Sequence, residues 1–316
     1  MTGAEHTAGA ASKAAPAGWS RRQAWRWGAS RLRETKAFTG DAVMESEVLL
    51  RAAAAISREE FFARPDAPLP PAAAAGYRAL VVRRAAGVPT AYVVGHREFF
   101  GLDLAIDARV LIPRPETECL VEAVVDALLC RRDPLVVDVG TGSGAIAIAL
   151  ARALPGARLL ATDVSCAALD VARKNAERCG VADRISWFAG PGLDPLRRCE
   201  AEGRVDALAC NPPYIPSAAV ATLAEEVREW EPRIALDGGP DGLDLHRAVA
   251  GGAAFYLAPG GVLAMEVAAL WDQARTVGGL IAATGAFGPA RVIRDHADAE
   301  RVVVAERISG RGDRQG

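Results

Sequence analysis

Residues 136–145 read Val136-Val137-Asp138-Val139-Gly140-Thr141-Gly142-Ser143-Gly144-Ala145. An apolar run, a glycine-rich turn and an Ala- and Ile-rich segment predict a buried strand, a tight loop and a helix. Glycines let the backbone turn sharply and let a ligand approach the helix N-terminus. Asp163 lies 19 residues after Gly144, where a carboxylate can accept hydrogen bonds from both ribose hydroxyls of an adenosine ligand. The predicted cofactor-binding residues here are Gly140, Thr141, Gly142, Ser143, Gly144 and Asp163.

Short apolar runs alternate with helical patterns on both sides of this loop. Such alternation is typical of a doubly wound, mainly parallel α/β sheet. The last two runs are separated only by Asp295–Glu300, too short for a helical crossover, so we expect an antiparallel pair at one edge. The predicted strands are Leu135–Val139, Arg158–Asp163, Ile185–Ala189, Val205–Cys210, Gly261–Val267, Ala290–Asp295 and Arg301–Glu306.

The tetrapeptide Asn211-Pro212-Pro213-Tyr214 follows the fourth of these strands. Prolines lack N–H groups, hold φ near about −65° and push the preceding residue toward extended geometry. The loop is therefore stiff and presents the Asn211 amide, bare carbonyls and the Tyr214 ring. Such a surface suits a planar NH2 group, whose two hydrogens need two acceptors. A proline-rich turn capped by asparagine is the alternative interpretation.

Two cofactors fit the glycine loop. Gly140, Gly142 and Ala145 also satisfy a relaxed dinucleotide fingerprint, so an NAD-linked oxidoreductase is a competing interpretation. The third glycine at Gly144, and a second loop at the same carboxyl edge of the sheet, favour S-adenosyl-L-methionine instead. A nicotinamide enzyme would also need a proton donor or acceptor near the hydride, and the sequence offers no convincing His or Lys.

Composition narrows the class of protein. The 316 residues are 51% hydrophobic with a formal net charge of −2, which indicates a folded protein and no general affinity for nucleic acid or anionic membranes. No apolar run approaches the roughly 18 residues of a membrane span. Six cysteines without a C-x-x-C pair and four scattered histidines predict reduced thiols, a cytoplasmic location and no metal site.

The N-terminal part has a helical sequence pattern. Residues 20–92 are predicted to form a small helical domain, with Asp41 capping one helix, Ser57 and Glu60 in a capping box, and Gly87 ending another helix. In residues 93–112 apolar and polar residues alternate with a period of two, which predicts a β-hairpin linker before an α/β domain at 113–308. The ends, 1–19 and 309–316, are predicted to be disordered.

Several segments together resemble one known family, the peptide chain release factor N5-glutamine methyltransferases (the PrmC/HemK family). The similarity covers about residues 40 to 307. The tetrapeptide is shared with adenine-N6 methyltransferases, whereas the segments around Pro115 and Asp241 are more specific. The segments that carry the resemblance are Gly95–Gly101, Leu111–Glu118, Gly140–Gly144, Asn211–Ile215, Glu231–Arg233, Ala235–Asp244 and Ala258–Gly261.

The resemblance implies a Rossmann-like class I methyltransferase domain joined by the hairpin to a helical substrate-recognition domain. It implies methyl transfer from S-adenosyl-L-methionine to the glutamine amide of the Gly-Gly-Gln motif in release factors, the expected partners. The glycine loop would wrap the methionine part of the cofactor, beside Asn211, and Asp163 would hold the ribose. Asn211 and the Pro212 carbonyl would accept the two amide hydrogens, and Tyr214 would pack against the amide. Pro213 completes the expected substrate site.

The sequence also departs from the family pattern. After the third strand the family usually has an acidic and then a bulky residue near the adenine, where this chain has Pro191 and Gly192. Ala268 stands where the family commonly has glycine. An adenine-N6 methyltransferase remains an alternative because an adenine amino group needs the same two acceptors, although it would need a basic path to the site. A cofactor-binding paralogue without catalysis is a further alternative.

Overall fold

The computed structural model describes residues 18–35, 38 and 40–309, and the chain divides into two compact units after Val94. The predicted disordered ends lie outside the described residues except for 18, 19 and 309. Trp19 corrects the predicted boundary, because this side chain is 5% exposed and its carbonyl accepts a hydrogen bond from Leu69 N at 2.7 Å. The ordered helical unit therefore begins before residue 20.

The first unit is helical, as predicted. Asp41 caps α2 by accepting from the Val43 and Met44 N–H groups, and Gly87 follows α4 with φ of +91°. Ser57 accepts from Glu60 N, whereas the Glu60 carboxylate pairs with Arg21, so only half of the predicted capping box forms. The helices are α1 (Arg21–Arg33), α2 (Ala42–Ala54), α3 (Arg58–Ala63), α4 (Pro71–Ala85) and α5 (Thr90–Val94).

The second unit contains the predicted hairpin and the predicted sheet. The hairpin pairs β1 (His96–Phe99) with β2 (Leu102–Ala105) in antiparallel register. The seven-stranded sheet has the order β5-β4-β3-β6-β7-β9-β8, and β9 runs antiparallel to both of its neighbours. The expected antiparallel pair at one edge is confirmed. The strands are β3 (Leu135–Val139), β4 (Arg158–Asp163), β5 (Ile185–Ala189), β6 (Val205–Cys210), β7 (Leu257–Glu266), β8 (Arg291–Arg294) and β9 (Glu300–Glu306).

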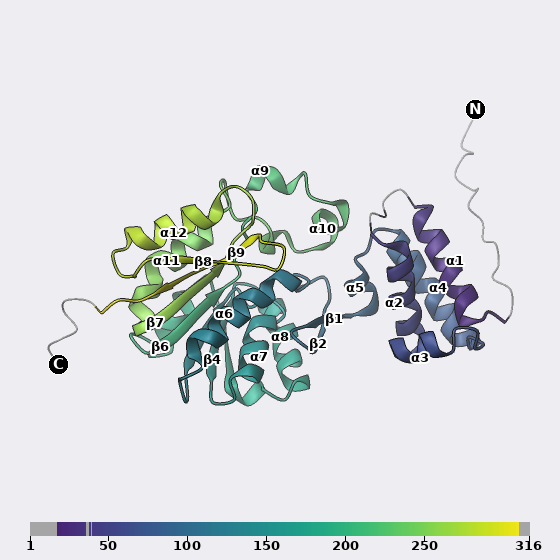
Figure 1. Cartoon of the computed structure of the whole chain (residues 1–316), viewed down its shortest axis with the longest axis horizontal. Helices are drawn as coiled ribbons and strands as arrows, with labels where there is room; N and C mark the ends of the chain where they lie inside the picture. The colour runs from purple at the N-terminus through teal and green to yellow at the C-terminus, as the bar shows by residue number, and fades with distance from the viewer. Residues whose placement is uncertain (1–17, 36–37, 39, 310–316) are drawn as a thin grey trace, which may run out of the picture. The chain divides into compact units, whose positions relative to one another are not determined.

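Helices cover both faces of this sheet (Figure 1). On one face α6, α7 and α8 pack in sequence, and on the other α11 and α12 bury Val249, Val277 and Ile281 against alternate strand residues. The helices are α6 (Glu118–Leu128), which follows the 3-10 turn η1 (Pro115–Thr117), α7 (Ala145–Ala153), α8 (Cys166–Arg178), α9 (Ser217–Val220), α10 (Glu225–Trp230), α11 (Asp244–Tyr256) and α12 (Gln273–Ala283). This is the Rossmann-like arrangement of class I methyltransferases.

Parallel register decides which loops meet. Val139 of β3 pairs with Thr162 of β4 and with Cys210 of β6, so the loops after these three strands emerge together at the carboxyl edge. That edge is where open α/β sheets bind ligands. Within the described ranges, none of the helices has both the length and the apolar character that crossing a membrane requires.

Candidate active site

A cavity of about 330 Å³ lies at this carboxyl edge. Its walls come from the segment before α6, the loops after β3, β4, β5 and β6, and the start of α11. Of the residues predicted from the sequence, the cavity is lined by Gly140, Thr141, Gly142, Ser143, Asp163, Asn211 and Pro213. Gly144, Pro212 and Tyr214 lie close by without lining it.

The glycine loop takes a backbone path that favours glycine. Gly140, Gly142 and Gly144 have φ values of +75°, +54° and +82°. A Cβ on Gly144 would lie 3.1 Å from the Ala172 Cβ, so this glycine serves the close packing of α7 against α8. A Cβ on Gly140 would lie 3.7 Å from the Asn211 carbonyl oxygen. The predicted cofactor loop and the tetrapeptide are therefore neighbours.

A buried carboxyl group anchors the loop. Asp138 Oδ2 accepts from Thr141 Oγ1 at 2.6 Å and from Ala147 N at 3.2 Å, which ties the strand to both sides of the turn. Burial raises the pKa of Asp138 to about 7, and the Thr141 hydrogen bond opposes this rise. Asp138 thus holds the shape of the loop from beneath without lining the cavity.

Asp163 ends β4 and lines the cavity. Its Oδ2 accepts from Gly142 N and its Oδ1 from Ser165 N, both at 2.8 Å. Burial raises the pKa of this carboxyl group, while the two backbone donors lower it. Each carboxylate oxygen has a second lone pair, so the group can accept two more hydrogen bonds from a ligand.

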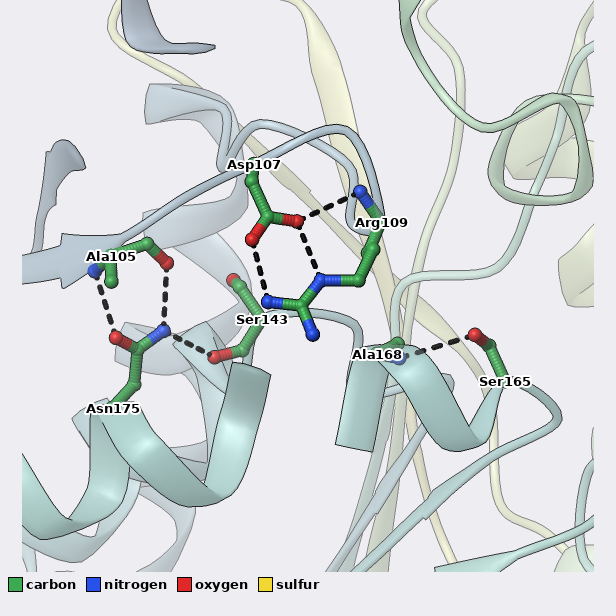
Figure 2. Close-up of polar contacts among 7 residues, drawn as sticks. All are labelled: Ala105, Asp107, Arg109, Ser143, Ser165, Ala168 and Asn175. Atoms are coloured by element: carbon green, nitrogen blue, oxygen red, sulfur yellow. Dashed lines mark hydrogen bonds and ion pairs between the residues drawn. The ribbon is translucent and has the colours of Figure 1, made fainter. Parts of the chain in front are cut away.

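The sequence interpretation missed Asn175, which connects the hairpin with the glycine loop, and Arg109, which lies on the segment after the hairpin (Figure 2). Asn175, fully buried on α8, accepts from Ala105 N at 2.7 Å and donates to Ala105 O at 3.0 Å and to Ser143 O at 2.9 Å. Arg109 lines the cavity and forms a two-pronged pair with Asp107, with N–O distances of 2.9 and 2.6 Å. The Asp107 carboxylate offsets the charge of Arg109, so this wall offers guanidinium N–H donors rather than an unpaired positive charge.

The Asn211 amide has a defined orientation. Its Nδ2 donates to Thr117 Oγ1 at 3.1 Å, so Oδ1 is the atom left to accept a hydrogen bond. Thr117 is 3% exposed and also lines the cavity. The segment before α6 therefore supports the tetrapeptide through a side chain that the sequence interpretation did not single out.

The segment after α10 supports the backbone of the same tetrapeptide. A Cβ on Gly238 would lie 2.4 Å from the Pro213 carbonyl oxygen, and one on Gly242 would lie 2.4 Å from the Tyr214 carbonyl oxygen. The Tyr214 carbonyl accepts from Gln273 Nε2 at 2.7 Å, and Gln273 is 1% exposed. These glycines lie where any side chain would displace the loop.

Another long-range contact joins the Leu111–Glu118 segment to the Glu231–Arg233 segment. Arg114 Nη2 donates to Glu231 Oε1 at 2.5 Å, and Glu231 Oε2 accepts from Ile112 N at 3.2 Å. Glu231 is 5% exposed, whereas the Arg114 side chain is partly exposed, so the buried carboxylate is paired with a half-buried guanidinium. Glu116 lies 3.9 Å from Arg301 of β9. The Leu111–Glu118 segment is thus attached at both ends to other parts of the site.

The departures from the family pattern, Pro191 and Gly192, also line the cavity. The Gly192 carbonyl accepts from Thr162 Oγ1 at 3.0 Å, which attaches this loop to β4. Leu245 of α11 would meet a Cβ on Gly192 at 3.4 Å and lines the same wall. This end of the cavity is therefore formed by backbone and apolar groups.

Two family models match the chain. The model described as the PrmC N-terminal domain matches residues 23–95, and the model described as the methyltransferase small domain matches residues 116–228.

Relatives of known name match over most of their length. The chain is 47% identical to the release factor glutamine methyltransferase of Moorella thermoacetica, over 84% of this chain and 91% of that protein. It is 44% identical to the protein of the same name from Geobacter sulfurreducens, over 78% of this chain and 83% of that protein. Among solved structures, the hMettl16 catalytic domain in complex with an RNA hairpin shares the fold, with a TM-score of 0.53 and 19% identity over 73% of this chain and 83% of that one.

Proposed function

The chain belongs to the release factor glutamine methyltransferase family, and on that premise we propose that it methylates the glutamine of the Gly-Gly-Gln motif in peptide chain release factors, with S-adenosyl-L-methionine as methyl donor. It is an enzyme, a protein-(glutamine-N5) methyltransferase. The observation that carries the substrate proposal is the orientation of Asn211, whose Oδ1 is left to accept one hydrogen of an NH2 group.

The cavity fits the proposed cofactor. Asp163 retains free lone pairs for ribose hydroxyls, and Arg109, although paired with Asp107, has further N–H donors for a carboxylate. Pro191, Gly192 and Leu245 offer an apolar wall for a purine ring. When bound, S-adenosyl-L-methionine supplies a methyl group on a positively charged sulfur, which makes that carbon electrophilic.

The chain's own residues would act mainly by orientation and electrostatics. A carboxamide nitrogen is a poor nucleophile because its lone pair is delocalised into the carbonyl. We propose that Asn211 Oδ1 and the Pro212 carbonyl accept its two hydrogens, orient the lone pair and stabilise the positive charge that grows on nitrogen. Tyr214 and Pro213 complete the substrate wall in this proposal. The methylated product keeps one N–H.

Replacement of Asp163 with alanine is expected to weaken S-adenosyl-L-methionine binding roughly 10²-fold, because it removes two charge-assisted hydrogen bonds to the ribose and the anchor of Gly142. Isothermal titration calorimetry measures the change. Asp183→Ala, at an exposed residue just before the amino end of β5 and so at the opposite edge of the sheet, is the matched control. Equal affinity in the two variants would remove Asp163 from the proposed ribose site.

Labelled methyl transfer tests the function itself. The enzyme is incubated with methyl-labelled S-adenosyl-L-methionine and, separately, with a release factor, the same factor carrying Gln→Ala in its Gly-Gly-Gln loop, and DNA. We expect label on the intact factor only. Label on DNA would support the adenine-N6 alternative, and label on neither would support a paralogue without catalysis.

The remaining parts have proposed roles that follow from this substrate. We propose that the helical domain, residues 20–92, recognises the release factor, and that residues 93–112 link it to the methyltransferase domain at 113–308. Release factors act in translation, so the cytoplasm is the proposed location. We propose no direct contact with nucleic acid.

A further inference from the structure

Glu266 is a buried carboxyl group at the carboxyl edge of the sheet that the mechanism above does not use. It ends β7, is 2% exposed, and its Oε2 has no hydrogen-bond partner among the residues that the structure describes. Because Cys210 of β6 pairs with Met265 of β7, the next residues on the two strands, Asn211 and Glu266, emerge side by side. An isolated buried carboxylate is costly, so its presence beside the site calls for a role.

Thr117 lies between Asn211 and this carboxylate. Thr117 Oγ1 accepts from Asn211 Nδ2 at 3.1 Å, so the single hydroxyl proton of Thr117 must go to another acceptor. The Thr117 and Tyr214 hydroxyls lower the pKa of the Glu266 carboxyl group, so both lie near it, and its Oε2, unpartnered among the described residues, is available as that acceptor. We propose that Glu266 is a positioning residue for methyl transfer, which holds Asn211 Oδ1 toward the substrate amide through Thr117.

The direction of the proposed hydrogen-bond chain from Asn211 through Thr117 to Glu266 depends on the charge of Glu266. An ionised carboxylate can only accept, so Thr117 donates to it and accepts from Asn211 Nδ2. A protonated carboxyl group can donate to Thr117, which then donates to Asn211 and draws Oδ1 away from the substrate. The NH2 group of Asn211 would then face the NH2 group of the substrate, and two donors cannot pair. A protonated carboxyl group still has an acceptor oxygen and so allows either direction, whereas the ionised group allows only the one that holds Oδ1 toward the substrate. Ionised Glu266 therefore favours the oriented state.

Burial raises the pKa of Glu266 to about 7, and the nearby Thr117 and Tyr214 hydroxyls oppose this rise. The Arg301 charge lowers the pKa of Glu266 and the Glu116 charge raises it. His246, whose own pKa burial lowers, binds the Glu266 backbone carbonyl through Nε2 at 2.9 Å. The other titratable groups that interact with Glu266 are Tyr214, Cys119 and Cys210.

The first test compares Thr117→Val with Thr117→Ser, and it rests on the proposed methyl transfer to a release factor. Valine keeps the shape but removes the hydroxyl, so kcat at saturating S-adenosyl-L-methionine should fall roughly 10-fold. Serine should restore most of that rate, and the cofactor Kd should be unchanged in both variants. Equal kcat in the two variants would overturn the proposal.

The second test is the pH profile of kcat in the wild-type protein and in Glu266→Gln. Wild-type kcat should rise with pH through an apparent pKa of about 7, the value for Glu266, and the variant should lose this limb. At saturating cofactor, Asp138 and Asp163 should not affect the pH profile of kcat, because both act on cofactor binding. A variant that keeps the wild-type limb would contradict the role of Glu266.

The contribution of Glu266 to the stability of the fold should fall over the same pH range in which kcat rises. The pKa of Glu266 is raised from 4.5 to about 7 on folding, so its contribution to stability is complete below about 4.5 and is lost as pH rises through 7. The Tm of Glu266→Gln relative to wild type should therefore rise with pH while wild-type kcat also rises. A Tm difference that is constant with pH would contradict the buried titration.

A readout independent of activity separates this inference from the proposed function. In 15N-labelled wild-type protein, the Asn211 side-chain amide resonances should titrate with the same apparent pKa, and in Glu266→Gln they should not. Failure of methyl transfer together with a titrating Asn211 amide would reject the substrate and keep the positioning chain. An amide that does not titrate in active enzyme would reject the chain and keep the substrate.

Discussion

Asn211→Ala is expected to fold and to lose roughly 10²-fold or more in kcat, comparable with the loss of one preorganised oxyanion-hole donor. The variant removes the acceptor Oδ1 and its attachment to Thr117, while the two prolines keep the backbone stiff. The remaining acceptor, the Pro212 carbonyl, cannot orient both amide hydrogens. Steady-state methyl transfer to a release factor measures the loss.

Thr222→Ala is the matched control, because Thr222 is an exposed residue between α9 and α10, on the segment that follows the tetrapeptide, and its hydroxyl donates to the Ala219 carbonyl at 2.8 Å. It should retain wild-type kcat. Circular dichroism and the cofactor Kd establish that Asn211→Ala is folded. A kcat/KM near the wild-type value in folded Asn211→Ala would reject Asn211 as the substrate acceptor.

Gly242→Ala is expected to destabilise the methyltransferase unit by roughly 2–4 kcal/mol, the sum of a left-handed conformation and an overpacked contact. Gly242 has φ of +78°, and a Cβ there would lie 2.4 Å from the Tyr214 carbonyl oxygen and 3.0 Å from Gln273 Nε2. Relief of this clash must move Tyr214 away from Gln273. We therefore expect kcat to fall more than cofactor affinity, because the loop that moves is the proposed substrate loop.

Gly251→Ala provides the comparison. Gly251 lies inside α11, and a Cβ at this position would have nothing within 4 Å, so alanine should be neutral or slightly stabilising there. Urea unfolding of both variants measures the difference in free energy. If Gly242→Ala unfolds at the same urea concentration as Gly251→Ala, the tight contact with Tyr214 is not a constraint on the fold.

Local pattern was enough to predict the sheet. Four strands, β3 to β6, have the predicted bounds, because each combines a short, largely apolar run with turn residues at its ends. The start of β7 was placed four residues late, at Gly261, because Ala258–Gly260 look like a turn in sequence. In the structure they continue the strand through an irregular register with β6.

The positions of the loops after the strands were enough to predict which residues meet at the sheet edge, because parallel strands place their carboxyl ends on one side of the sheet. It was not enough to predict what holds them. Thr117 meets Asn211 across 94 residues, and Asn175 meets Ala105 across 70. Neither contact has a local periodic signal. The segments that resemble the family, Leu111–Glu118 and Ala235–Asp244, contain Thr117 and Gly242, but the sequence did not indicate which residues these two contact.

The amino-acid order therefore specifies the alternating strands and helices, the glycine loop and the stiff tetrapeptide, since each depends on properties of neighbouring residues. Only the packed molecule decides that Asn211 presents its oxygen, that Glu266 lies beneath it and that Gly242 leaves room for Tyr214. The physical reason is that hydrogen-bond direction and close contact depend on register and packing between distant segments. Such distances exist only after the chain has folded.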